Sequence, residues 1–88
     1  MLQDYEILDK NFHSRFGEID IVALKNRVLH FVEVKSGANS HERITKSKLS
    51  KIIKTVEFYL NIKRLDYDYQ IDAIFIQDDI EHLENITI

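Results

Sequence analysis

The segment IDIVALKNRVLHFVEVK, residues 19–35, decides the fold. Two apolar, β-branched runs, Ile19–Leu24 and Val28–Val34, flank the polar residues Lys25-Asn26-Arg27, which is the pattern of a β-hairpin. The second run barely alternates between apolar and polar residues. We therefore expect it in the middle of a sheet that is covered on both faces.

The residues outside this hairpin predict one helix and three further strands. Asn39 and Glu42 are spaced to cap a helix start, and the apolar residues that follow recur at helical spacing, so we expect a helix from about residue 42 to about residue 62. The helical stripe comprises Leu49, Ile52, Ile53, Val56, Tyr59 and Leu60. The strands are predicted at Tyr5–Leu8, before the polar stretch Asp9-Lys10-Asn11, at Tyr69–Ile76 and at Ile80–Ile88. The sequence thus predicts an α/β fold with a mixed sheet, in the order β-β-β-α-β-β.

Length and composition limit the class of protein. The 88 residues, 44% apolar and 31% charged, predict a single globular domain over residues 1–88. The absence of cysteine excludes disulfides and thiolate metal sites. No apolar run approaches the roughly 20 residues that span a bilayer, and the N-terminus lacks the order of a signal peptide. We expect no membrane partner and a cytoplasmic location.

Charge is distributed unevenly along the chain, although its net charge is only −3. Residues 41–64 hold seven Lys or Arg against two acids, whereas residues 65–88 hold seven acids and no Lys or Arg. Such asymmetry gives one face a positive field that suits nucleic acid. A solvated basic helix beside an acidic tail explains the same pattern equally well.

Charged residues interrupt the two most apolar strands. Asp20 lies within the first strand of the hairpin, and Glu33 and Lys35 end the second. Side chains two residues apart in a strand share a face, so Glu33 and Lys35 project together. Mg²⁺ or Mn²⁺ prefers one or two carboxylates with water and other hard oxygens, so we predict Asp20, Glu33 and the Val34 carbonyl as metal ligands. Lys35 is then placed to orient the attacking water or to stabilise a pentavalent phosphorus.

The hairpin register makes this site testable. Asp20 shares a face with Glu33 only if the numbers of paired residues sum to an odd value. Pairing of Leu24 with Leu29 sets Asp20 directly opposite Glu33, whereas pairing of Leu24 with Val28 separates them. We predict the odd register. Ordinary strand-end charges or a structural ion pair remain the alternative, because an E-x-K triplet alone is common.

Other polar residues have weaker signals. Glu18 has the same parity as Asp20 and is a candidate additional acid, or an ordinary charge at the strand entry. Asp72 interrupts an apolar strand, and we interpret it as a buried polar partner for a loop or for Lys35. The four histidines lack zinc-ligand spacing, so zinc is not expected, and His30 is predicted to be a packed, hydrogen-bonded histidine.

Two blocks of the sequence, RFGEIDIVA at residues 15–23 and LHFVEVK at residues 29–35, closely resemble the YraN family of bacterial proteins. The similarity continues through Lys48 to Tyr59-Leu60, then through the IDAI segment of residues 71–74 and the IEH segment of residues 80–82. That family is similar to the restriction-endonuclease-like PD-(D/E)XK superfamily, near the archaeal Holliday-junction resolvases. The resemblance implies that Asp20, Glu33 and Lys35 are catalytic.

The resemblance also suggests contacts to DNA, including branched DNA. Lys48 matches a basic position at the start of the family's central helix, and a helical wheel places it on the edge shared with Ile52 and Tyr59. On the same wheel Lys51 points further away. Lys48, Arg15 and Lys51 are the candidate nucleic-acid-binding residues, although Arg15 is equally explained as solvated and Lys48 as a surface lysine that covers the apolar edge with its stem.

This sequence departs from the family pattern in two places. Relatives usually begin with an amphipathic helix that carries a glutamate, whereas here a strand already starts at Tyr5. We therefore expect that helix to be missing or reduced to Met1–Asp4, and the uncovered sheet surface to favour a homodimer. Gln70 stands where the family often has a basic residue, so one phosphate or ion-pair contact is expected to be lost.

Three functions are compatible with these features. The first is a metal-dependent DNA endonuclease or junction-resolvase-like enzyme. The second is a nucleic-acid-binding module with weak or no catalysis. The third is a structural protein whose dimer surface is its function.

Overall fold

The computed structural model describes residues 4–37 and 44–86. The described residues form a mixed α/β fold with a five-stranded sheet and one helix, as predicted, and no helix among them is long and apolar enough to cross a membrane. In chain order the elements are β1 (Glu6–Ser14), β2 (Gly17–Lys25), β3 (Val28–Ser36), α1 (Lys46–Lys63), β4 (Asp68–Ile76) and β5 (Ile80–Leu83).

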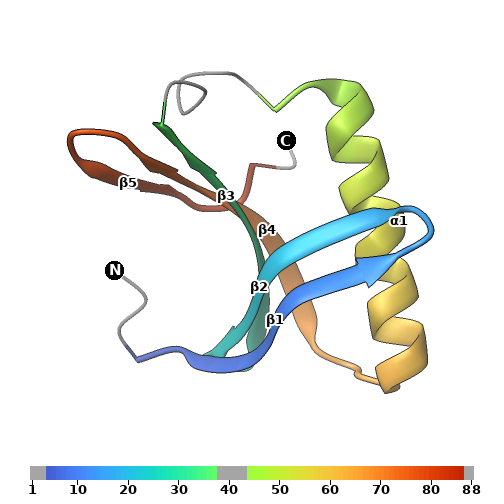
Figure 1. The fold of residues 1–88 in the computed structure, drawn as a ribbon. Coiled ribbons are helices and arrows are strands. Elements are labelled where there is room, and N and C mark those ends of the chain that lie inside the picture. The colour runs from blue at the N-terminus through green and yellow to red at the C-terminus, as the bar shows by residue number, and fades with distance from the viewer. Residues whose placement is uncertain (1–3, 38–43, 87–88) are drawn as a thin grey trace.

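The strands lie side by side in the same order as in the sequence, which places β3 at the centre of the sheet. Neighbouring strands are antiparallel except for β3 and β4, which are parallel and joined through α1. Four consecutive residues of β3, Leu29 to Val32, are buried, as expected for a central strand covered on both faces. Figure 1 shows α1 along one side of the strongly twisted sheet, with β4 and β5 curving away from it.

The β2–β3 hairpin has the predicted register. Leu24 pairs with Leu29, and the ladder extends one pair further, from Lys25 to Val28. The turn therefore contains only Asn26 and Arg27, both with positive φ (51° and 64°). Two consecutive residues with positive φ form a two-residue hairpin turn of type I′, and the twist of this turn matches the right-handed twist of the flanking strands.

The first strand is longer than predicted. β1 continues through Asp9-Lys10-Asn11 to Ser14, so the predicted end of the strand at Leu8 was wrong. The strand accommodates these polar residues because it lies at the edge of the sheet and its pairing with β2 is irregular: the register shifts between Ile7 and Asp9, and Asn11 has a φ of 51°. Residues 1–3, where a residual N-terminal helix was expected, lie outside the described residues.

The helix starts later than predicted, because Thr45 is its N-cap and its first residue is Lys46. The Thr45 hydroxyl accepts a hydrogen bond from the Lys48 backbone amide at 3.2 Å, which satisfies a free amide of the first turn. The predicted cap residues, Asn39 and Glu42, lie outside the described residues. At the other end of the chain, β5 ends at Leu83 and not at Ile88.

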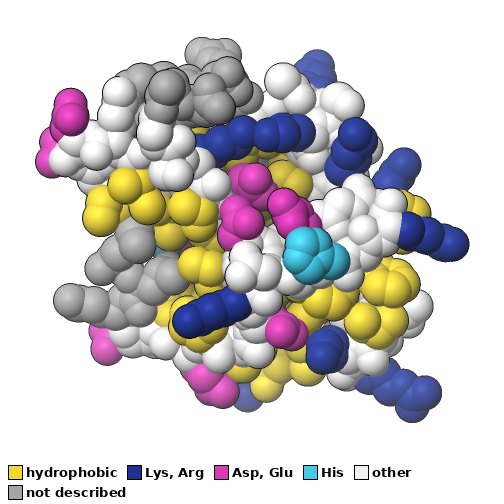
Figure 2. Space-filling view, viewed as in Figure 1, with side chains coloured by type: hydrophobic (Ala, Val, Ile, Leu, Met, Phe, Trp, Pro, Cys, Tyr) yellow, Lys and Arg dark blue, Asp and Glu magenta, His cyan; other side chains and the backbone are white. Residues whose placement is uncertain are grey.

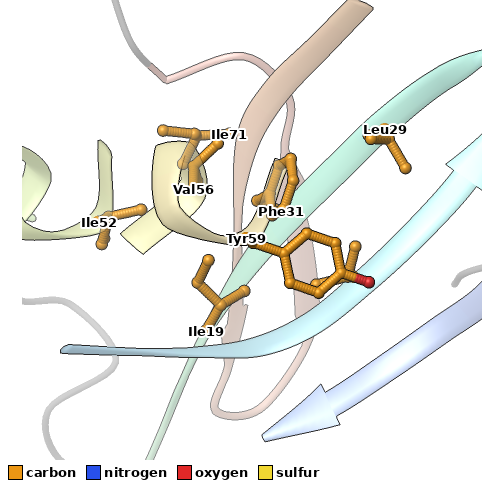
Figure 3. Packing of buried hydrophobic residues seen from close by; sticks show 8 residues of the cluster. Ile19, Leu29, Phe31, Ile52, Val56, Tyr59 and Ile71 are labelled. Carbon is orange, nitrogen blue, oxygen red and sulfur yellow. The ribbon is translucent and has the colours of Figure 1, made fainter. Parts of the chain in front are cut away.

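The hydrophobic core lies between α1 and the sheet. The predicted helical stripe supplies Ile52, Val56 and Tyr59, which Figure 3 shows facing Phe31 and Ile71 of the sheet. The rings of Phe12 and Phe31 both contact Tyr59 edge-on, with centroid separations of 4.9 and 5.6 Å. The buried cluster consists of Ile19, Val22, Leu29, Phe31, Ile52, Val56, Tyr59 and Ile71.

Tyr59→Phe is expected to lower the free energy of unfolding by about 1 kcal/mol near neutral pH, because only one hydrogen bond is lost. The Tyr59 hydroxyl donates to Asp9 Oδ2 at 3.1 Å. Burial and this bond raise the pKa of Tyr59 from 10.0 to about 12. The folded protein thus holds the phenol proton more tightly, and stability should fall as pH rises from about 10 to about 12. Urea denaturation should show that the free energy of unfolding falls less steeply between these pH values in Tyr59→Phe than in the wild type. An equally steep fall in both proteins would contradict the raised pKa of Tyr59.

Candidate functional site

The candidate site lies where β2 separates from β3. Their ladder ends at the pair Ile21 and Val32, one position before Asp20 and Glu33. Beyond that pair the Asp20 side chain continues the connection, because its Oδ2 atom accepts a hydrogen bond from the Val34 amide at 2.7 Å. The carboxylate is therefore held against the backbone of the strand that carries Glu33 and Lys35.

Glu33 has the most informative electrostatic environment of the site. Burial raises its pKa, and the negative charge of Asp20 raises it further, with a smaller contribution from Glu18. Lys48 and Lys35 act in the opposite direction, since each cation favours the ionised carboxylate. All four of these residues therefore lie close enough to Glu33 to act on its charge. Figure 2 shows acidic side chains gathered near the middle of one face, beside a group of Lys and Arg side chains.

The tip of the β1–β2 hairpin lies against α1 beside Glu33. Gly17 has a φ of 150°, and a Cβ atom at this position would lie only 3.4 Å from Thr55 Oγ1. Glu18 follows Gly17, and its carboxylate lies 3.1 Å from Nδ1 of His13, the residue that it faces on β1. Glu33 lines a hollow between the hairpin and the helix together with Gly17, Glu18, Lys48, Lys51 and Ile52.

Asp20 lines a second, shallow hollow, together with Lys10, Asn11, Ile21 and Val34, which Glu33 does not line. The predicted register is thus confirmed in the backbone, and the two carboxylates interact electrostatically, but the Asp20 side chain turns toward the Val34 amide. The alternation of side chains along β2 is broken at this point. Residues three apart in a regular strand face opposite sides of the sheet, yet Ile19 and Val22 both belong to the core on the helix side.

The candidate nucleic-acid-binding residues are placed unequally. Lys48 lies near Glu33, as the helical wheel suggested. Lys51 also lines the Glu33 hollow, although the helical wheel places it further than Lys48 from Ile52. A Cβ atom at Gly17 would lie 4.0 Å from the Cβ of Lys51, so Lys51 faces the tip of the β1–β2 hairpin. Arg15 lies in the β1–β2 turn with its guanidinium 4.9 Å from the Phe16 ring centroid. It lines another hollow with Lys54 and Phe58.

A second polar cluster, not predicted from the sequence, surrounds Asp72 of β4. Asp72 is fully buried, which confirms the predicted buried polar role, and it accepts a hydrogen bond at 3.0 Å from the backbone amide of Asn85 in the segment after β5. His30 Nδ1 lies 2.7 Å from Asp72 Oδ2, which confirms the predicted packed, hydrogen-bonded histidine. His82 Nε2 lies 2.9 Å from the same oxygen. Parallel pairing of β3 and β4 brings His30 and Asp72 together, and local sequence carries no signal for that pairing.

Glu33→Gln is expected to stabilise the metal-free protein at pH 7 by up to about 1 kcal/mol. The pKa of Glu33 is raised above 4.5, so the folded state binds its proton more tightly and stability is lost as pH rises through that raised pKa. Urea denaturation in EDTA should show that Glu33→Gln has a higher free energy of unfolding than the wild type at pH 7, and that this difference is smaller at pH 4. Glu81→Gln, at an exposed position of β5, is the matched control. A loss of stability at pH 7 would contradict this environment for Glu33.

The fold and its charged residues define a small α/β domain with an acidic cluster, flanked by lysines, where two central strands separate. The model of the uncharacterised protein family UPF0102 matches residues 1–76, and the chain belongs to this family. It is 57% identical over 88 residues to a UPF0102 protein of Sulfurimonas denitrificans, covering 96% of this chain and 81% of that relative. UPF0102 proteins of Campylobacter hominis and Campylobacter fetus are 51% and 52% identical, over 96% and 97% of this chain and 79% and 80% of theirs.

Proposed function

We propose that this protein is a metal-dependent nuclease that hydrolyses phosphodiester bonds in DNA, with a restriction-endonuclease-like PD-(D/E)XK site. The observation that carries the proposal is the gathering of Asp20, Lys35 and Lys48 around Glu33, whose pKa is raised by burial and by Asp20. A half-buried carboxylate next to a second carboxylate is unfavourable in its ionised form, and perturbed acids of this kind concentrate at functional sites.

The donor set fits a hard divalent cation. Two carboxylates that repel one another lose that repulsion when they share a positive ion, and Mg²⁺ and Mn²⁺ favour oxygen ligands. Asp20 and Glu33 would hold the ion, with the Val34 carbonyl as a further ligand. When bound, the ion would lower the pKa of a coordinated water and would stabilise negative charge on the phosphoryl oxygens. The hydrogen bond from the Val34 amide fixes Asp20 for this role before the ion arrives.

The lysines supply the remaining charge. Lys35 and Lys48 both favour the ionised form of Glu33, and this supports a role for their positive charge in holding a scissile phosphate. Lys35 would orient the attacking water or stabilise the phosphorane, and Lys48 would contact a phosphate oxygen. Lys51 adds positive charge beside Glu33, and the exposed residues Lys46 and Lys54 extend the positive surface along α1. This arrangement supports a DNA substrate despite the net charge of −3.

Cleavage assays test this proposal. The purified chain is incubated with linear duplex, single-stranded and branched DNA in Mg²⁺, Mn²⁺ or EDTA. Cleavage that requires the metal is expected, with binding that weakens steeply as salt is raised. Salt-sensitive binding without cleavage in any metal would contradict the enzyme and favour a nucleic-acid-binding module. A stable dimer with no DNA affinity at low salt would favour a structural protein.

A further inference from the structure

The cluster around Asp72 brings side chains of four segments to one point. Asp72 lies on β4, His30 on the neighbouring β3, His82 on β5, and Glu84 directly after β5. One ring nitrogen of each histidine lies close to the same oxygen, Asp72 Oδ2. The distance is 2.7 Å from His30 Nδ1 and 2.9 Å from His82 Nε2. Asp72 is fully buried and His30 is 5% exposed, so the cluster is part of the protein interior.

Glu84 adds a fourth donor atom. Its Oε1 atom lies 4.0 Å from His30 Nδ1, and one ligand atom each of His30, Asp72 and Glu84 fall within 4.8 Å of one another. The Glu84 side chain is 59% exposed and that of His82 is 17% exposed, so this side of the cluster is open to solvent. A small ion can therefore reach the buried donors past Glu84.

The other oxygen of Asp72 is fixed by hydrogen bonds. Asp72 Oδ1 accepts from Gln70 Nε2 at 2.9 Å and from the Asn85 amide at 3.0 Å. Gln70 Nε2 also lies 3.4 Å from Glu84 Oε1 and so connects the two acids. Metal-binding carboxylates have such outer partners, which orient the ligating oxygen. Here they leave Oδ2 aimed at the two histidines.

A cation would stabilise the cluster further. Burial of the Asp72 carboxylate is costly, and the structure offsets that cost with hydrogen bonds and with His30 and His82, each of which is charged only when protonated. A divalent ion supplies positive charge and suits two imidazoles with two carboxylates. We propose that His30, Asp72, His82 and Glu84 form a binding site for a divalent transition metal of the zinc class.

Three of the distances between the proposed ligand atoms are close to those that this ion needs. Zinc–ligand bonds of about 2.0–2.2 Å place tetrahedral ligand atoms about 3.3–3.6 Å apart. The two imidazole nitrogens lie at 2.7 and 2.9 Å from Asp72 Oδ2, and Glu84 Oε1 lies at 4.0 Å from His30 Nδ1. Outward shifts of the rings by about half an ångström, with an inward turn of the exposed Glu84, would seat the ion between them.

The bound ion would cross-link the strands on one side of the sheet. It would join β3, β4 and β5 and fix the segment after Leu83, which the Asn85 amide already anchors to Asp72. This site is distinct from the acidic site of Asp20 and Glu33 in position and in chemistry. Nitrogen donors favour the zinc class over Mg²⁺, whereas the oxygen donors at Asp20 suit Mg²⁺ or Mn²⁺.

Metal titrations test the His30–Asp72–His82–Glu84 site in a variant from which the acidic site of Asp20 and Glu33 has been removed. In the double variant Asp20→Asn/Glu33→Gln, we expect calorimetry to show one equivalent of Zn²⁺ bound and zinc to raise the Tm. Co²⁺ in place of Zn²⁺ should give the visible absorption of a tetrahedral ion. In nitrogen-detected NMR, zinc should shift the ring nitrogens of His30 and His82 and leave those of His13 unchanged. Because nuclease activity plays no part in these measurements, their result is independent of the proposed function.

Single substitutions then identify the ligands. His82→Asn and Glu84→Gln keep polar contacts while removing a ligand. Each should weaken zinc binding by at least roughly 10- to 100-fold, the loss that is typical when a residue that only hydrogen-bonds to a metal ligand is removed. His13→Asn, at an exposed histidine, is the matched control and should leave the affinity unchanged. Absence of saturable zinc binding to the folded double variant, or ring nitrogens of His30 and His82 that zinc does not shift, would overturn the proposal.

Discussion

Asp20→Asn is expected to lower the rate of metal-dependent DNA cleavage by at least about 1000-fold, which corresponds to about 4 kcal/mol of lost transition-state stabilisation. The substitution removes the negative charge of one metal ligand. It leaves an amide oxygen in the same position, which can still accept the hydrogen bond that the Val34 amide now donates to Asp20 at 2.7 Å. The variant should therefore fold normally while losing activity.

The choice of asparagine matters for this experiment. Asp20→Ala would leave the Val34 amide without its partner, at a cost of about 1–3 kcal/mol, so lost activity would be confounded with lost stability. Circular dichroism and a thermal melt should give matching results for the wild type and Asp20→Asn. Asp78→Asn makes the same chemical change at an exposed position between β4 and β5 and should keep full activity. Cleavage that persists in Asp20→Asn and in Glu33→Gln would place the chemistry elsewhere.

The sequence predicted the β2–β3 hairpin well because its determinants are local. The turn Asn26-Arg27 and the two apolar runs fix the register together, and the Leu24–Leu29 pair follows from them. The same reasoning placed Asp20 opposite Glu33. It did not predict that the Asp20 side chain reaches the Val34 amide, since that contact depends on where the two strands separate. Divergence of strands is a property of the whole sheet.

Long-range pairing limited the remaining predictions. Asp9-Lys10-Asn11 are polar and typical of a loop, yet pairing with β2 keeps them in a strand. Asp72 was recognised as unusual because it interrupts an apolar strand, but apart from Gln70 its hydrogen-bond partners come from residues 30, 82 and 85, which are distant in sequence. No local pattern connects these positions. They meet only because β4 lies parallel to β3 and β5 returns beside β4.

Asp72→Ala is expected to lower the free energy of unfolding of the metal-free protein by about 3–5 kcal/mol, the cost of breaking a buried charged network by removing one partner. The total stability of a small domain is about 5–15 kcal/mol, so this variant should be close to unfolding. Burial alone would raise the pKa of Asp72, but hydrogen bonds from the Asn85 amide, Gln70, His30 and His82 outweigh it and lower the pKa. The carboxylate is thus ionised and bonded in the folded state.

The direction of the pH dependence follows from that lowered pKa. An acid whose pKa is lower in the folded state stabilises the protein above its unfolded pKa of about 3.8, and this contribution is lost as pH falls through the folded pKa. Urea denaturation in EDTA should therefore show a large difference between the wild type and Asp72→Ala at pH 6 that narrows below pH 4. Asp79→Ala, at an exposed loop position, is the control and should change stability by no more than about 0.5 kcal/mol.

A double-mutant cycle decides whether the network acts as a unit. His82→Ala alone should destabilise the protein, because it removes a donor from the buried Asp72 carboxylate. Once Asp72 is alanine, His82 has lost this acceptor, so the same change should cost much less. We expect an interaction energy between the two substitutions of about 1–3 kcal/mol. Additive costs would mean that Asp72 and His82 contribute independently, and the contact would then not explain why a carboxylate is buried at this position.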